Sequence, residues 1–188
     1  HIDDMTKRIG EMDDLMNQYL MEYQEAIHAL DEMPGIGRQS AETILAEIGL
    51  DMNRFPTEKH LSNWAGLAPG NNESAGKRRY GRTTKGNITL KTTLVQCAKS
   101  AVKKTDSFLA AQYQRLVVRR GANRATVAVA HTMLIAIYHM LKEHVPFLDL
   151  GAAYYNQFNA QSKINHYLKK LKQLGWAPND ATTLTAAT

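Results

Sequence analysis

The stretch Met33-Pro34-Gly35-Ile36-Gly37 decides the fold, because it places a tight turn between two segments of helical spacing. Proline removes a backbone donor and its ring blocks continuation, so the helix before it ends near Pro34. Helical spacing resumes over residues 38–48, and Gly49 ends it. The sequence therefore predicts two helices joined by a short hairpin.

A glycine-hydrophobic-glycine hairpin is typical of helix-hairpin-helix modules that bind nucleic acid. Two glycines let backbone N–H groups approach phosphate oxygens, and the positive end of the following helix adds to the attraction. The candidate contact consists of Gly35, Ile36, Gly37 and Arg38, with Ile36 filling the core between the helices. We expect Gly35→Val or Gly37→Val to weaken binding while the domain still folds. A plain connector between two helices is the alternative interpretation.

Upstream of the hairpin, apolar residues recur at steps of three and four over residues 1–32. This spacing predicts one long, coiled-coil-like helix. Its seam would face either a second copy of the chain or the chain's own domain. The members of the seam are Ile2, Met5, Ile9, Met12, Met16, Tyr19, Tyr23, Ala26 or Ile27, Leu30 and Met33.

Downstream lies a basic, glycine-rich loop over residues 70–87, with an expected small hairpin around Lys77 to Tyr80. Five cations fall within nine residues of it and no carboxylate separates them. Such a loop is suited to phosphate contact. The five candidate binding residues are Lys77, Arg78, Arg79, Arg82 and Lys85.

Ser74 in this loop fits neither of two common motifs. Five residues separate Gly70 from Gly76, whereas a Walker-type phosphate loop has four before Gly-Lys-Ser/Thr. A hydrolase nucleophile elbow has Gly-x-Ser-x-Gly after a strand, which this segment lacks. The remaining catalytic interpretation is that Ser74 attacks a phosphodiester. The loop cations would neutralise the charge that develops on phosphorus, and a general base or metal ion would come from elsewhere. A simple turn-forming serine is the alternative.

Charge divides the chain into two unlike parts. Residues 1–32 have a net charge of −7 and the remaining 156 residues +12. A basic body attracts polyanions, although basic charge also serves solubility. Cys97 is the only cysteine, so an intramolecular disulfide is excluded, a reducing cytosol is the expected compartment, and a buried position is favoured for this residue. The seven histidines show no metal-ligand spacing, and we expect no metal site in this chain.

Helical spacing is also present at about 58–65, 88–101, 106–118 and 123–143, so the fold class is mainly α. The apolar run Val127–Leu141 is shorter than the ~20 residues of a membrane span, which predicts a buried helix and no membrane partner. After Pro146 we expect an irregular stretch and then a basic helix near 159–174. The chain divides into a coiled-coil or linker helix (1–32), a helix-hairpin-helix domain (33–145), a basic helical extension (146–178) and a disordered tail (179–188).

Further motifs follow the hairpin in order: Ala46-Glu47-Ile48-Gly49-Leu50-Asp51 with Arg54-Phe55, Trp64-Ala65-Gly66-Leu67-Ala68-Pro69, Ser74-Ala75-Gly76-Lys77, Gly81-Arg82-Thr83-Thr84-Lys85-Gly86-Asn87, and Tyr113-x-Arg115-Leu116. The set closely resembles the carboxy-terminal domain of bridge-RNA-guided insertion-sequence transposases. These are DEDD-type serine recombinases, related also to the pilin-gene invertase. The resemblance covers about residues 1–145.

The resemblance implies that Ser74 is the nucleophile of a recombinase that cuts and rejoins DNA through a phosphoserine intermediate. Ala75 departs from the glycine more usual after that serine. In the family, a RuvC-like domain supplies four metal-binding carboxylates, and Mg²⁺ is expected there. That domain is absent from these 188 residues, which begin with His1, so we expect a piece of a longer protein.

We expect this piece alone to be inactive and to have no cofactor of its own. Its expected partners are DNA, a guide RNA and a second copy bound through the coiled coil, in the nucleoid-associated cytoplasm of a bacterium or archaeon. A non-catalytic helix-hairpin-helix DNA-binding module is the main alternative. A coiled-coil scaffold that binds RNA is the third.

Overall fold

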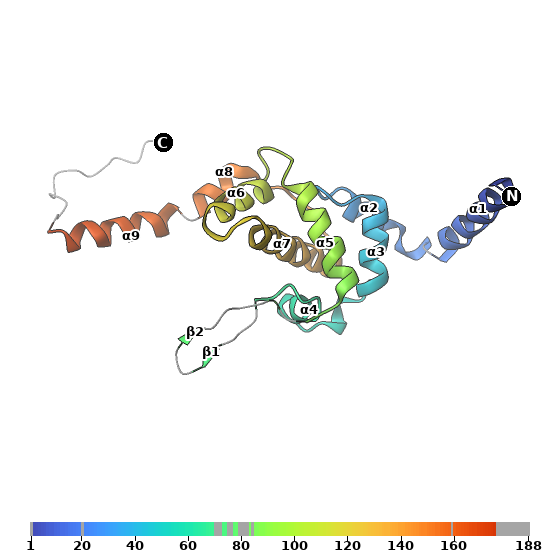
Figure 1. Ribbon diagram of the computed structural model, residues 1–188, viewed down its shortest axis with the longest axis horizontal. Helices are drawn as coiled ribbons and strands as arrows, with labels where there is room; N and C mark the ends of the chain where they lie inside the picture. Colours follow the sequence, from blue (N-terminus) through green and yellow to red (C-terminus); the bar gives the residue numbers. More distant parts are fainter. Residues whose placement is uncertain are drawn as a thin grey trace.

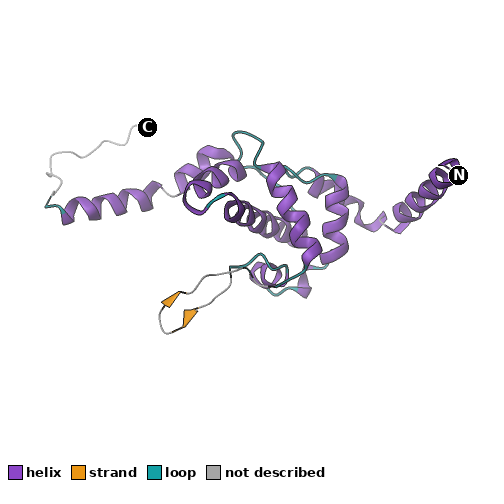
Figure 2. Cartoon of the chain, in the orientation of Figure 1, coloured by secondary structure: helices purple, strands orange, loops and turns teal. Residues whose placement is uncertain are grey.

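The computed structural model describes residues 2–19, 21–69, 73–74, 77–78, 83, 85–158 and 160–175. In this part of the chain nine α-helices and one two-stranded hairpin are present, which confirms a mainly α-helical fold (Figure 2). The helices are α1 (Ile2–Tyr19), α2 (Gln24–Asp31), α3 (Arg38–Ile48), α4 (Glu58–Trp64), α5 (Ile88–Ala101), α6 (Phe108–Arg120), α7 (Ala122–Glu143), α8 (Gly151–Phe158) and α9 (Ala160–Gln173). The strands are β1 (Glu73–Ser74) and β2 (Lys77–Arg78).

Helix α7 lies at the centre of the domain. Helices α4, α5 and α6 pack against it, α3 packs on α5, and α2 packs on α3 (Figure 1). Its 22 residues are long and apolar enough to cross a membrane by length and composition, and most of this helix is buried within the domain. The expectation of a buried helix here is therefore confirmed.

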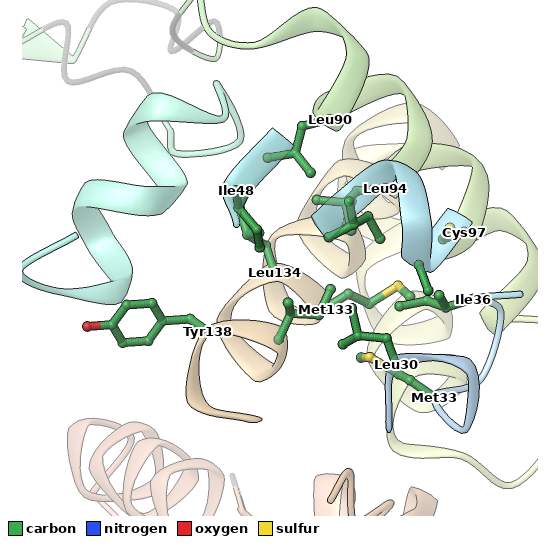
Figure 3. Close-up of a cluster of buried hydrophobic side chains, with 14 of the residues drawn as sticks. Leu30, Met33, Ile36, Ile48, Leu90, Leu94, Cys97, Met133, Leu134 and Tyr138 are labelled. Atoms are coloured by element: carbon green, nitrogen blue, oxygen red, sulfur yellow. The ribbon is translucent and has the colours of Figure 1, made fainter. Parts of the chain in front are cut away.

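Most side chains of the core come from α2, α3, α5 and α7 (Figure 3), and Ile36 of the hairpin, Leu61 of α4 and Leu109 of α6 add to it. Burying this much apolar surface supplies the main favourable free energy of folding. The hydroxyl of the buried Tyr138 on α7 donates to the carbonyl of Phe55 at 3.1 Å, so its polar end is satisfied at the edge of the core.

The prediction of one continuous helix over residues 1–32 is wrong. Helix α1 ends at Tyr19, a 3₁₀ turn spans Met21–Tyr23, and α2 begins at Gln24. Ile27 and Leu30 of α2 are buried in the domain core, whereas the apolar seam of α1 is exposed. A repeat of apolar residues shows that one face of a helix packs against another apolar surface, but it does not show which surface, so the change from exposed α1 to buried α2 is not visible in the sequence.

The expectation of an irregular stretch after Pro146 is wrong for residues 151–158, which form helix α8. Asp149 Oδ1 accepts the backbone N–H groups of Phe108 at 2.9 Å and Gly151 at 3.0 Å. The ring of Phe108 meets that of Tyr155 edge-on, with centroids 4.9 Å apart. These contacts with α6, rather than helix propensity, stabilise α8. The predicted basic helix near 159–174 corresponds to α9, and the expected disordered tail lies outside the described residues.

Candidate nucleophile arm and nucleic-acid interface

The predicted hairpin between α2 and α3 is present, and it is docked on helix α5. The backbone N–H of Ile36 donates to the carbonyl of Met33 at 3.1 Å, and Gly35 has a φ of 85°. This is the geometry of a β-turn whose third residue needs glycine. Ile36 is 4% exposed, and in Figure 3 it lies beside Met33 and Cys97, so the predicted plug between the helices is confirmed.

Gly35 packs on the backbone of α5, and this contact decides what the residue does. A Cβ added at Gly35 would lie 2.5 Å from the nitrogen of Ala101 and closer still to the carbonyl oxygen of Cys97. Real Cβ atoms do not approach backbone so closely, and a φ of 85° is strained for L residues. The expectation that the domain folds normally with a side chain at this position is therefore wrong.

Gly37, by contrast, faces open space. A Cβ built there meets nothing within 4 Å, and the residue is exposed. Gly37 is the N-cap of α3, and no side chain caps that end of the helix. Arg38 follows it, exposed, with its Nε 2.9 Å from Glu42 Oε1. Of the two hairpin glycines, only Gly37 stands where a ligand can reach the backbone.

Strands β1 and β2 of the basic loop lie away from the helical body in Figure 1, and we use the name arm for the described residues 69, 73–74, 77–78 and 83 of this loop. Pro69 and Thr83 form a β-bridge at its base. Lys91 Nζ on α5 donates to Thr83 Oγ1 at 2.7 Å. At Gly86, an added Cβ would lie 2.5 Å from the carbonyl carbon of Ala65 and closer still to the next backbone nitrogen, so the two chain segments at the root are pressed together.

Asn87 joins the root of the arm to three helices. Its backbone N–H donates to the carbonyl of Trp64 at the end of α4. Its side-chain oxygen accepts the N–H of Leu90 at 2.9 Å, which caps α5. Its amide nitrogen donates to Glu47 Oε2 of α3 at 2.5 Å. One residue thus fixes the base of the arm relative to the domain.

Ser74 lies in the hairpin of the arm. The antiparallel register pairs Ser74 with Lys77 and Glu73 with Arg78. The predicted hairpin is therefore present, but its strands lie at residues 73–78 rather than around Lys77 to Tyr80. Of the other candidate cations, Lys85 is exposed at the root, whereas Arg79 and Arg82 lie outside the described residues.

The two candidate phosphate-binding features lie at opposite ends of α5. Asn87 at the arm root caps the N-terminus of this helix, and Gly35 packs on Cys97 and Ala101 near its C-terminus. The 14 residues of α5 span roughly 20 Å at 1.5 Å per residue. The arm and the hairpin are therefore two separate candidate features at the two ends of one helix, not one composite pocket.

Burial shifts the pKa values of two groups in the helical body, Cys97 and His131. Burial raises the pKa of the Cys97 thiol, although a hydrogen bond with Ser40 partly offsets this. The thiol is thus a weak nucleophile in the folded state. Burial lowers the pKa of His131 on α7, which keeps that ring neutral at neutral pH. Among the described residues, no group of three or more His, Cys, Asp or Glu side chains is arranged to hold a metal ion.

Sequence reasoning missed the residues that fix the arm. Glu47 and Asn87 were noted only as parts of motifs, and the roles of Thr83 and Lys91 were not considered. One signal was present: an asparagine directly before a helical segment is a strong N-cap candidate. Nothing in the sequence pairs Asn87 with Glu47, because 40 positions separate them.

Comparison with known proteins gives a match to a family model. Residues 27–114 match the model of the family described as "Transposase IS116/IS110/IS902 family". The matched segment runs from α2 to α6 and so includes the hairpin, the arm and α5.

Two curated relatives resemble the chain. One is the "Transposase for insertion sequence element IS1111A" of Coxiella burnetii, 31% identical over 122 residues, which are 62% of this chain and 33% of the relative. The other is the "Insertion element IS110 uncharacterized 43.6 kDa protein" of Streptomyces coelicolor, 30% identical over 127 residues, which are 66% of this chain and 31% of the relative. The chain thus spans about a third of the length of the curated relatives it matches.

Proposed function

We propose that this chain is the DNA-binding and serine-nucleophile part of a transposase that cuts and rejoins DNA through a phosphoserine intermediate. The observation that carries the proposal is the place of Ser74 in the arm. The register makes Lys77 its cross-strand neighbour, and the root of that arm is held by Thr83, Gly86 and Asn87. The match of residues 27–114 to a transposase family supports the same function.

In the proposed reaction the hydroxyl oxygen of Ser74 attacks a phosphodiester phosphorus. The serine proton passes to a base outside the arm, a bond forms between the serine oxygen and phosphorus, and the bond from phosphorus to a deoxyribose oxygen breaks. The departing sugar oxygen takes up a proton. A hydroxyl of another strand end then reverses these steps, so that one phosphodiester is exchanged for another and no nucleotide cofactor is consumed.

The cations of the arm have a defined part in this scheme. Negative charge grows on the non-bridging oxygens during attack, and cationic side chains held in place before the reaction stabilise it. We assign this role to Lys77, Arg78, Arg79, Arg82 and Lys85. A fixed root serves the chemistry because it limits the directions from which the arm can present Ser74.

The metal-binding carboxylates belong, in this proposal, to a RuvC-like domain outside this chain. The described residues offer no cluster that fits a divalent ion, so no step above is routed through one. Asp3, Asp4, Asp13 and Asp14 lie on the single helix α1 and do not substitute for such a cluster. We expect the 188-residue chain alone to bind DNA without cutting it, and Mg²⁺-dependent strand cutting by the purified chain would contradict this.

The remaining partners are also part of the proposal. Gly37, Arg38 and the start of α3 contact a phosphate backbone without reading sequence, and a guide RNA selects the target. Helix α1 joins two copies through its exposed seam, which includes Ile2 at 79% and Met12 at 67% exposure. The place of action is the nucleoid of a bacterium or archaeon.

The test is covalent capture by the full-length protein with guide RNA, Mg²⁺ and labelled target DNA. A DNA–protein adduct is expected on Ser74 and is expected to be absent in Ser74→Ala. Ser162→Ala, in helix α9, serves as a matched control and keeps the adduct. Mass spectrometry of the adduct identifies the attached residue, and attachment elsewhere would contradict the assignment.

A non-catalytic helix-hairpin-helix module is the second candidate. The open position of Gly37 at the uncapped start of α3 favours DNA binding whether or not Ser74 reacts. If no DNA–protein adduct forms under conditions of full DNA occupancy, the non-catalytic module is favoured. Binding of RNA with no affinity for DNA would favour the coiled-coil scaffold instead.

A further inference from the structure

A stretch of 32 residues without a carboxylate begins at the candidate nucleophile and includes the whole of α5. Residues 74–105 contain no Asp or Glu and carry nine cations. These are Lys77, Arg78, Arg79, Arg82, Lys85, Lys91, Lys99, Lys103 and Lys104. Helices α6 and α9 also lack carboxylates, but α5 alone of these three directly follows the basic loop and is followed by Lys103 and Lys104.

Helix α5 has two distinct faces. The buried face packs against α3 and α7. The other face is exposed, and after Ile88 at the start of the helix its exposed side chains are two threonines, one glutamine, one lysine and one serine at helical spacing. The exposed polar residues are Thr89, Thr92, Gln96, Lys99 and Ser100, and the exposed Lys103 and Lys104 follow in the turn after the helix. We call these seven residues the α5 track.

We propose that the α5 track binds the phosphate backbone of duplex DNA and connects the arm to the helix-hairpin-helix turn. Hydroxyl, amide and ammonium groups are the side chains that contact phosphate oxygens in protein–DNA complexes. The proposal rests on the function proposed above and adds a site to it.

The position of the α5 track supports this assignment. Lys91 of the same helix donates to Thr83 at the arm root, and Gly35 packs on the last turn, so the track runs from one candidate contact point to the other. The length of α5, roughly 20 Å, corresponds to about six base pairs at 3.4 Å each. A helix of that length can lie across several consecutive phosphates of a duplex.

Carboxylates on neighbouring elements do not cancel the charge of the track. Glu47 of α3 accepts from Asn87, and Glu42 pairs with Arg38. Asp106 is exposed beyond the end of α5, after Lys103 and Lys104. The two neighbouring glutamates thus already have partners, and the acid beyond the helix stands at one end of the track.

The test inserts one negative charge at the middle of the track. Gln96→Glu is nearly isosteric, and Glu is a good helix former, so the variant is expected to fold with an unchanged melting temperature. Gln114→Glu makes the same change on the exposed surface of α6 and is the matched control. Fluorescence anisotropy with the 188-residue chain and a 20-base-pair duplex measures Kd at several salt concentrations, and a double-stranded RNA of equal length is the second probe.

We expect Gln96→Glu to weaken duplex DNA binding roughly five- to tenfold near 0.1 M salt, and Gln114→Glu to change Kd less than about twofold. A Lys99→Gln/Lys103→Gln variant should lower the salt slope by about two units. If the wild-type chain binds DNA and the two Glu variants bind alike, the track is wrong and the proposed function stands. If the wild-type chain does not bind DNA at all, both are wrong. Weakening confined to RNA would also overturn the track.

Discussion

The hairpin at residues 33–37 and the root of the arm use glycine in the same way but leave different groups exposed. Gly35 is pressed against the backbone of α5, and Gly86 is pressed against the backbone of Gly66. The hairpin closes on the core through Ile36, whereas the arm is held at its base and its hairpin projects from the helical body (Figure 2). Gly35 and Gly86 thus serve the fold, whereas Gly37 and Ser74 carry the proposed function.

The largest expected effect is on folding, at Gly35. Gly35→Ala puts a Cβ against the backbone of α5 at a φ of 85°, and neither clash partner is a flexible side chain. We expect a loss of roughly 3 kcal/mol or more in the free energy of unfolding, measured by urea denaturation.

Gly37→Ala is the matched control for this change. The added methyl group meets nothing within 4 Å, so we expect unfolding within about 1 kcal/mol of the wild type. If the two variants prove equally stable, the hairpin is not docked on α5 as described. DNA affinity should fall in Gly37→Ala although its fold is intact.

The second prediction uses the reactivity of the Cys97 thiol to test the contact between the hairpin and α5, because the carbonyl oxygen of Cys97 faces Gly35. Because burial raises the pKa of the thiol, less reactive thiolate is present at a given pH than in an unfolded chain. At pH 8, alkylation by iodoacetamide should be at least about tenfold slower in the native protein than in urea. Gly35→Ala should accelerate it, and Gly37→Ala should not; equal native and denatured rates would place the thiol at the surface.

The helical domain was largely predictable because its elements carry local signals. Proline and glycine delimit α3, and α7 is marked by a long apolar run. Two features were not predictable from such signals. The break between α1 and α2 occurs where one apolar seam changes from exposed to buried, and α8 depends on Phe108 and Asp149 of other segments.

The candidate site was predictable only as a set of residue types. Ser74 and the nearby cations could be chosen from composition and resemblance, because phosphate chemistry needs those side chains. Their separation from the hairpin by the length of α5 is a property of the packing. The Asn87–Glu47 contact joins residues 40 positions apart, and no local pattern encodes it.

The third prediction tests whether the arm root positions Ser74, as distinct from merely stabilising a helix. Asn87→Ala removes the cap of α5 and leaves Glu47 without this amide donor, so we expect a loss of about 1–2 kcal/mol in the free energy of unfolding. Ser107→Ala removes the corresponding cap of α6, which accepts from Ala110, and should cost about the same. Only Asn87→Ala should reduce Ser74 adduct formation in the full-length protein at saturating DNA. If both variants reduce it alike, the arm root has no positioning role.

The smallest expected effect concerns charge. Arg82 and Lys85 belong to the basic loop, whereas Lys169, Lys170 and Lys172 are exposed on α9, away from the arm (Figure 1). Alanine at either group should lower the salt slope of DNA binding by about one unit per lost phosphate contact. Only the loop is assigned a part in the reaction, because its cations share a short segment with Ser74. In the full-length protein, Arg82→Ala with Lys85→Ala should suppress the Ser74 adduct even when protein concentration is raised to restore DNA occupancy, and the α9 triple alanine should recover fully under the same compensation. If both variants recover alike, the loop cations act only as a tether and their proposed part in stabilising the transition state is wrong.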